Sequence, residues 1–186
     1  LAPRDFECHN NLGITLRELG RLEEAEKSLR QVTKLKPDHI FAHNNLGITL
    51  QALGRLDEAE ESCKQAIKLK PDFLDAHNNL GNIFLKLDKL IAAEKSYRQV
   101  IKLKSDYAIG YCNLGITLKA LGRFDEAEKN YKQAIKLKPD FTEAYDALAV
   151  VMNLKGDLKS GLKFYEWRLH LKKHIARLPR KEFSWD

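Results

Sequence analysis

The sequence has few of the features that mark membrane, secreted or metal-binding proteins. No apolar run approaches the roughly 20 residues that a membrane helix needs, and no charged-then-apolar leader opens the chain. The three cysteines, Cys8, Cys63 and Cys112, are odd in number, far apart and not arranged as CxxC, which argues against a disulfide framework or a zinc knuckle. We therefore expect a reducing, cytoplasmic setting, no membrane contact and no metal.

The sequence also lacks the motifs of common enzyme classes. It contains no P-loop, no Gly-rich dinucleotide turn, no HExxH and no GxSxG. We therefore predict that the chain is not an enzyme and has neither catalytic residues nor a cofactor. Because the first residue is Leu1 rather than Met, we expect the chain to be processed or to be a piece of a longer protein.

A period of 34 residues runs through most of the chain. The segments HNNLGITL, HNNLGITL, HNNLGNIF and YCNLGITL begin at His9, His43, His77 and Tyr111. Other residues that keep the same step are Gly13, Gly47, Gly81, Gly115, Ala25, Ala59, Ala93, Ala127, Pro37, Pro71 and Pro139, with Ser105 in place of a further proline. Because several independent positions share this period, the chain is predicted to consist of repeats.

Each repeat reads as two helices. In residues 41–53, Leu46, Leu50 and Leu53 recur at helical spacing, and Gly54 then ends the helix. Residues 57–70 begin with acids and end with lysines, which suits the helix dipole. A glutamate in each second helix precedes an Arg or Lys by four residues, which supports an exposed helix face; the pairs are Glu26–Arg30, Glu60–Lys64, Glu94–Arg98 and Glu128–Lys132.

This order of Leu-Gly, Ala and Pro resembles the tetratricopeptide repeat family. The resemblance implies an all-α, right-handed superhelical solenoid of antiparallel helix pairs. Within residues 1–141 it places four regular repeats, at 6–39, 40–73, 74–107 and 108–141. A degenerate, capping fifth repeat follows at 142–174, where Ala149 stands for Gly and Gly161 for Ala. Residues 175–186 are expected to be a basic tail or the start of a linker to a further domain.

In proteins that this chain resembles, the first helices of successive repeats line a concave groove that binds extended peptides. The second, fifth, sixth, ninth, twelfth and thirteenth positions of a repeat face that groove. The resemblance thus singles out Asn10, Asn11, Ile14, Asn44, Asn45, Ile48, Asn78, Asn79, Asn82, Asn113 and Ile116. The row of asparagines is similar to that in the repeat arm of O-linked N-acetylglucosamine transferase.

An asparagine amide offers two donors and an acceptor that match a peptide group. We therefore predict a protein-interaction scaffold that binds an extended protein or peptide in this groove, with Asn11, Asn45, Asn79 and Asn113 contacting its backbone. The alternative is that these asparagines only cap helices, or that duplication of one ancestral repeat multiplied them.

Two other repeated features have simpler interpretations. His9, His43 and His77 replace the packing Trp of the family, and helices stand too far apart for them to share one zinc ion, so a structural role is expected. Two lysines lie at the end of each second helix, for example Lys34 and Lys36, but nearby acidic residues offset their charge. We therefore expect a solvated face here and no binding of nucleic acid.

The C-terminal end differs from the repeats. From Lys155 onward there are 9 basic and 4 acidic residues, against 23 and 22 before it, so most of the net charge of +6 lies here. Leu158, Leu162, Tyr165 and Leu169 form an apolar stripe that is expected to pack inward. A second stripe suggests a self-association end and a homo-oligomer; its residues are Phe164, Trp167 and Leu171, with Trp185 beyond them.

A further hypothesis concerns the same end of the chain. The run YEWRLHLKK and the later FSWD resemble the junction at which bacterial repeat proteins lead into glycosyltransferase-like domains. On this reading, the chain is the recognition arm of a larger enzyme whose catalytic part lies outside it.

Overall fold

The computed structural model describes residues 5–164 and 166, and every regular element in that part of the chain is a helix. No described helix is long and apolar enough to cross a membrane. The helices are α1 (Asp5–Glu18), α2 (Leu22–Leu35), α3 (Ile40–Ala52), α4 (Leu56–Leu69), α5 (Leu74–Lys86), α6 (Leu90–Leu103), α7 (Ala108–Ala120), α8 (Phe124–Leu137) and α9 (Thr142–Leu154). A further helical segment covers residues 158–164.

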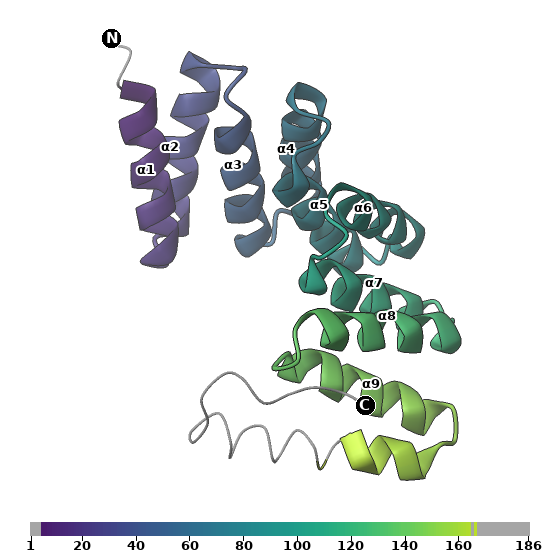
Figure 1. Cartoon of the computed structure of the whole chain (residues 1–186). Helices are drawn as coiled ribbons and strands as arrows, with labels where there is room; N and C mark the ends of the chain where they lie inside the picture. Colours follow the sequence, from purple (N-terminus) through teal and green to yellow (C-terminus); the bar gives the residue numbers. More distant parts are fainter. Residues whose placement is uncertain (1–4, 165, 167–186) are drawn as a thin grey trace. The chain divides into compact units, whose positions relative to one another are not determined.

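The chain divides into two compact units. Unit 1 (Leu1–Leu103) contains α1 to α6, and unit 2 (Lys104–Asp186) contains α7 to α9 and the helical segment at 158–164 (Figure 1). Within unit 1, α1, α3 and α5 lie next to one another, and each also packs on the helix that follows it. Within unit 2, α7 packs on α8 and α9 in the same manner.

The local signals of the sequence place the helices almost to the residue. Residues 41–53 and 57–70 are the predicted pair, and α3 and α4 begin and end one residue earlier. Asp57 and Glu58 lie in the first turn of α4 and Lys68 in its last, as the helix dipole favours. Gly54 ends the first helix with a φ of +78°, a left-handed conformation that glycine adopts without strain.

One turn of this kind lacks its glycine. Gly20, Gly54, Gly122 and Gly156 have φ values of 75°, 78°, 75° and 84°. At the corresponding turn between α5 and α6 the residue is Asp88, whose φ is 56°. Aspartate tolerates the left-handed region better than most residues, but it is not free of strain there.

A glycine in each first helix lets the second helix approach closely. A Cβ on Gly47 would stand 2.5 Å from Cys63 Sγ, and one on Gly81 would stand 2.7 Å from the Tyr97 ring. Cys63 thus serves as a small apolar filler, and its burial raises the pKa of the thiol to about 12. The close contact between the two helices of a repeat is therefore set by the 34-residue glycine of the sequence.

The degenerate repeat keeps this close contact, but its glycine and alanine have exchanged places: Ala149 lies in the first helix and Gly161 in the second. Gly161 is buried against α9, where a Cβ would meet the Asn153 side chain and lie 3.1 Å from the carbonyl oxygen of Ala149. Leu158 and Leu162 are 67% and 63% exposed. The prediction that these two leucines pack inward is wrong, because the helix turns the side that carries Gly161 toward α9. Tyr165 and Leu169 lie outside the described residues.

Glutamates link the second helices of successive repeats. Glu26 accepts hydrogen bonds from Arg30 on its own helix at 2.7 Å and from Arg55, just before α4, at 2.6 Å. Glu60 bonds in the same way to Lys64 and Lys89, and Glu128 to Lys132 and Lys155.

The four predicted glutamate pairs are confirmed, and their basic side chains are 46–54% exposed, but the glutamates themselves are largely covered. The glutamate side chains are only 12–16% exposed. The contacts of Glu26, Glu60 and Glu128 supply the reason, since a base in the turn before the next second helix (Arg55, Lys89 or Lys155) covers each of these carboxylates.

Candidate functional site

The asparagines predicted to face a peptide form a row across unit 1. We call Asn10, Asn11, Asn44, Asn45, Asn78 and Asn79 the amide row; it lies on α1, α3 and α5, which are neighbours. Asn45 Nδ2 donates to Asn10 Oδ1 at 3.2 Å, and Asn79 Nδ2 donates to Asn44 Oδ1 at 2.9 Å. Each bond joins the sixth position of one repeat to the fifth position of the repeat before it.

These bonds orient the amides and leave part of each amide available. Asn44 is only 6% exposed, whereas Asn45 and Asn79 are half-buried. Asn45 and Asn79 each donate one N–H along the row, and an amide has two N–H groups and a carbonyl oxygen. The second N–H and the side-chain oxygen of Asn45 and of Asn79 thus form no hydrogen bond with another described residue. Such a set can pair with the C=O and N–H of a bound backbone.

The remaining predicted residues of unit 1 differ in their roles. Ile14 and Ile48 are half-buried one helical turn beyond the asparagines. Asn82 Oδ1 accepts a hydrogen bond of 2.7 Å from the hydroxyl of Tyr97, which is fully buried. Asn82 therefore satisfies a buried group of α6, a function that spacing alone could not indicate.

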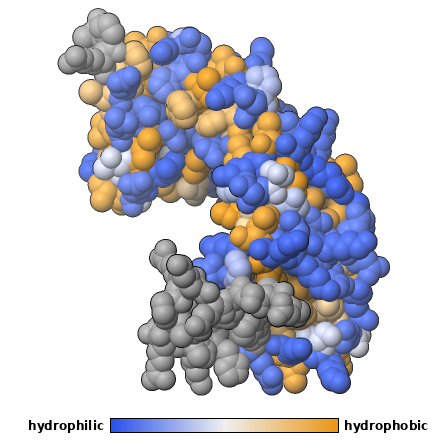
Figure 2. Space-filling model, in the orientation of Figure 1, coloured by the Kyte–Doolittle hydropathy of each residue, from blue (hydrophilic) through white to orange (hydrophobic). Residues whose placement is uncertain are grey.

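The corresponding face of unit 2 is more apolar. Asn113 is half-buried on α7, and Ile116 is 36% exposed. Val150 on α9 is 44% exposed, at the position that corresponds to Ile116. Cys112 is buried, and its pKa is raised to about 11 by burial and by the charge of Glu143, so its thiol is not activated. Figure 2 shows hydrophilic residues over much of the visible surface of both units, with hydrophobic residues between them.

The repeated histidines fasten the junctions between repeats. Nε2 of His43 lies 2.7 Å from the carbonyl oxygen of Pro37, and Nε2 of His77 lies 2.8 Å from that of Pro71. A carbonyl oxygen can only accept a hydrogen bond, so Nε2 is the donor in both contacts, and these histidines hold the turn before their own helix. In the described part of the chain no group of three His, Cys, Asp or Glu side chains could hold a metal ion.

Lysines at the ends of the second helices contact aromatic rings. Lys36 lies 4.6 Å from the centroid of Phe6, and Lys138 lies 5.0 Å from that of Phe141. Such cation–π contacts are worth about 0.5–1 kcal/mol at exposed sites. One lysine of each of these pairs thus has a structural contact that the sequence interpretation missed. Phe141 directly follows the KLKPD at 136–140, but Phe6 lies in the first helix of its repeat, so proximity in the sequence indicated only the second contact.

Of the predicted self-association end, only Phe164 lies among the described residues, where it is half-buried. Trp167, Leu171 and Trp185 fall outside them. Leu154, Leu158 and Leu162 are 56%, 67% and 63% exposed, so the described part of this end does present apolar side chains to solvent.

Comparisons with known proteins agree with this architecture. Family models described as tetratricopeptide repeat match residues 40–73, 74–107 and 108–141, and a model described as TPR repeat matches residues 13–54. No curated protein matches the chain.

Solved structures with the same fold are described as MamA. "Crystal structure of MamA" is 26% identical, covers 89% of this chain and 97% of its own, and has a TM-score of 0.82. "Crystal structure of MamA protein" is 24% identical over 100% of both chains, also with a TM-score of 0.82. "MamA 41-end from Desulfovibrio magneticus RS-1" is 20% identical over 91% of this chain and 96% of its own, with a TM-score of 0.84. The predicted all-α solenoid of helix pairs is confirmed.

Proposed function

Because the chain belongs to the tetratricopeptide repeat family, whose solenoids serve as protein-interaction scaffolds, we propose that it binds an extended polypeptide along α1, α3 and α5. The backbone of that polypeptide contacts the amide row. The observation that supports this proposal most is the pair of inter-repeat bonds, from Asn45 to Asn10 and from Asn79 to Asn44. They hold neighbouring amides in a fixed orientation, which lowers the entropy lost when a ligand binds.

The amide row suits a backbone better than it suits particular side chains. Every peptide group offers one donor and one acceptor, and an amide side chain matches both. Successive first helices pack about 8–10 Å apart, and an extended chain advances about 3.3 Å per residue. An asparagine from each helix can therefore meet the backbone about every third residue, whatever the sequence of the ligand.

The test removes the two amides that donate along the row, and circular dichroism checks that the helices remain. We compare the double variant N45A/N79A with the control Q31A/Q65A, which removes two amides from the second helices α2 and α4. Short peptides selected from a random display library on the full chain serve as probes, and their affinities are measured by calorimetry. Each hydrogen bond is worth about 1 kcal/mol, so N45A/N79A should weaken binding about tenfold or more, and the control should not. Equal affinities of the two variants, at equal helicity by circular dichroism, would show that the amide row does not bind peptide.

Self-association through the C-terminal end is a second candidate function, favoured by the exposure of Leu154, Leu158 and Leu162. Light scattering over a concentration series tests it: association that the variant L158E/L162E abolishes supports the candidate, and a monomer at the highest concentration excludes it. The recognition-arm hypothesis rests on residues outside the described part and stays a prediction.

A further inference from the structure

An exposed aromatic ring lies beside the amide row. Phe41 precedes Asn45 by one turn of α3 and is 58% exposed, which is unusual for a phenylalanine. Its ring meets that of Phe73 edge-on at 5.4 Å and that of His39 at 6.3 Å. An aromatic side chain that is both exposed and held by other rings offers a fixed surface to a ligand.

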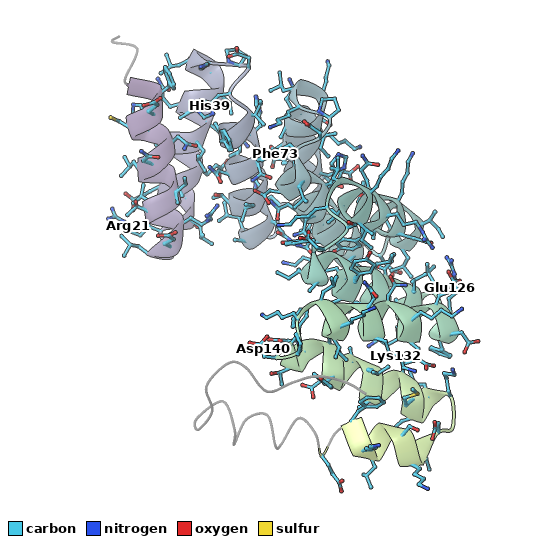
Figure 3. All side chains as sticks on the ribbon, viewed as in Figure 1. Arg21, His39, Phe73, Glu126, Lys132 and Asp140 are labelled. Atoms are coloured by element: carbon cyan, nitrogen blue, oxygen red, sulfur yellow. The ribbon has the colours of Figure 1, made fainter. Side chains whose placement is uncertain are left out.

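The two neighbouring rings are themselves anchored. Phe73 is 9% exposed and packs in a cluster with Ala66 and Ala76. His39 caps α3, because its Nδ1 accepts a hydrogen bond of 3.0 Å from the backbone N–H of Ala42. Figure 3 labels both residues, His39 before α3 and Phe73 before α5. Phe41 is therefore held by groups that belong to the fold and need no ligand to order them.

Acidic residues flank Phe41 along the same row of positions. Phe41 is the second residue of its predicted repeat, and the second residues of the neighbouring repeats are Glu7 on α1 and Asp75 on α5. Both are exposed, and neither forms an ion pair with another described residue. Lys36, from the same end of unit 1, is held over Phe6. The second positions of these three repeats thus hold an acid, an aromatic residue and an acid, and within the described part of the chain neither acid has a basic partner.

We propose that Phe41, together with the carboxylate of Glu7 on one side or of Asp75 on the other, forms a subsite for a cationic side chain, arginine above all, of the extended polypeptide. The inference rests on the proposed function and names the chemistry of its partner. Guanidinium groups stack on aromatic rings and pair with carboxylates. One helical turn is about 5.4 Å, which an arginine side chain spans when its backbone lies on the amide row.

The opposite side of the row accepts a different residue. Ile48 follows Asn45 by one turn, so Phe41 and Ile48 lie on opposite sides of the same asparagine. Successive side chains of an extended peptide point to opposite sides. The preferred ligand therefore has a basic residue directly next to an apolar one.

The experiment uses the full chain and the peptides selected from the random display library. The strongest binder is made again with its basic residue changed to leucine, and both peptides are measured against the wild type, F41L, F41W and I91A. F41L keeps an apolar side chain without a π system, and F41W restores the π system. Ile91 is 69% exposed on α6, away from the amide row, and serves as the control.

We expect selected peptides to be enriched in arginine or lysine. Replacing that residue by leucine should weaken binding about 2- to 30-fold, the range of cation–π contacts. F41L should weaken the binding of the basic peptide by a similar factor and leave the binding of the leucine peptide unchanged, and F41W should bind the basic peptide as the wild type does. The variant E7Q/D75N should also bind the basic peptide more weakly, and this loss should be larger at low salt than at high salt.

Two results overturn the inference and are distinguishable. In the first, the selected peptides need Asn45 and Asn79 but show no preference for a basic residue, or F41L weakens the basic and the leucine peptide equally. Either outcome refutes the subsite and leaves the proposed function standing. If no peptide is selected at all, the proposed function fails and the subsite fails with it.

Discussion

Two tyrosines at the same repeat position differ in their hydrogen bonding, so the same substitution should change the free energy of unfolding in opposite directions at the two sites. Tyr97 and Tyr131 are both fully buried, and each faces the glycine of its partner helix. The Tyr97 hydroxyl donates to Asn82 at 2.7 Å. Where repeat three has Asn82, repeat four has Ile116, and the Tyr131 hydroxyl has no hydrogen-bond partner among the described residues. Burial raises the pKa of both hydroxyls, so neither ionises near neutral pH.

The same substitution should therefore have opposite signs at the two sites. Y97F removes a hydrogen bond and should lower the free energy of unfolding by about 0.5–1.5 kcal/mol. Y131F removes a buried hydroxyl whose desolvation, about 1–3 kcal/mol, no bond offsets, so it should raise the free energy of unfolding by about 1 kcal/mol. The loss of van der Waals contacts is nearly equal in the two variants, because both lose one oxygen atom in a tightly packed site.

Urea denaturation followed by circular dichroism gives the two changes. Hydrogen exchange of amides in α6 and α8 locates them, since a repeat array need not unfold in one step. I116N supplies a matched control by giving Tyr131 the acceptor that Tyr97 has; in that background Y131F should be destabilising. Equal losses for Y97F and Y131F in the wild-type chain would refute the reasoning.

Further predictions concern the turns and the links between repeats. Only glycine adopts the left-handed conformation of this turn freely, so G54A should lower the free energy of unfolding by about 1 kcal/mol and D88G should raise it by about 0.5 kcal/mol. Thermal denaturation measures both changes, and a G54A variant more stable than the wild type would contradict the turn geometry. Hydrogen bonds from Lys132 and then Lys155 lower the pKa of Glu128. Because its pKa is lower in the folded state, the stability that it contributes is present at neutral pH and is lost as the pH falls below the ordinary carboxyl value of about 4.3. E128Q should remove this part of the acid dependence, at a loss of about 0.5–1 kcal/mol at neutral pH, and an unchanged pH profile would show that the link contributes nothing.

Local features of this fold could be predicted from the sequence, and features that depend on stacking could not. Periodicity, the dipole pattern and Gly54 act within a few residues, so they located α3 and α4 to within one residue. The burial of Glu26 depends on Arg55, a residue 29 positions away that reaches it only when two repeats stack. No pattern within one repeat shows such a contact.

The error at Leu158 and Leu162 has a different cause. The spacing of hydrophobic residues identifies an apolar side of a helix. When a helix has two apolar sides, as this one does, the spacing does not show which of them faces the core. Gly161, between the two leucines, carried the better signal. In the regular repeats the small residues mark the side of closest approach, and the same rule applied to the exchanged pair Ala149 and Gly161 would have turned the helix correctly.

The amide row illustrates why stability and binding must be separated residue by residue. Asn45 and Asn79 bond to the preceding repeat, so a structural need alone would account for asparagine at these positions, although that need is a contact between repeats and not the helix capping that the sequence suggested as the alternative. Asn11 occupies the same position in α1, is exposed, and its side-chain amide has no hydrogen bond with any described residue. A structural role predicts that N11A changes nothing. If the row binds a backbone, N11A leaves the free energy of unfolding unchanged and yet weakens the selected peptides about fivefold, the value of one hydrogen bond of about 1 kcal/mol.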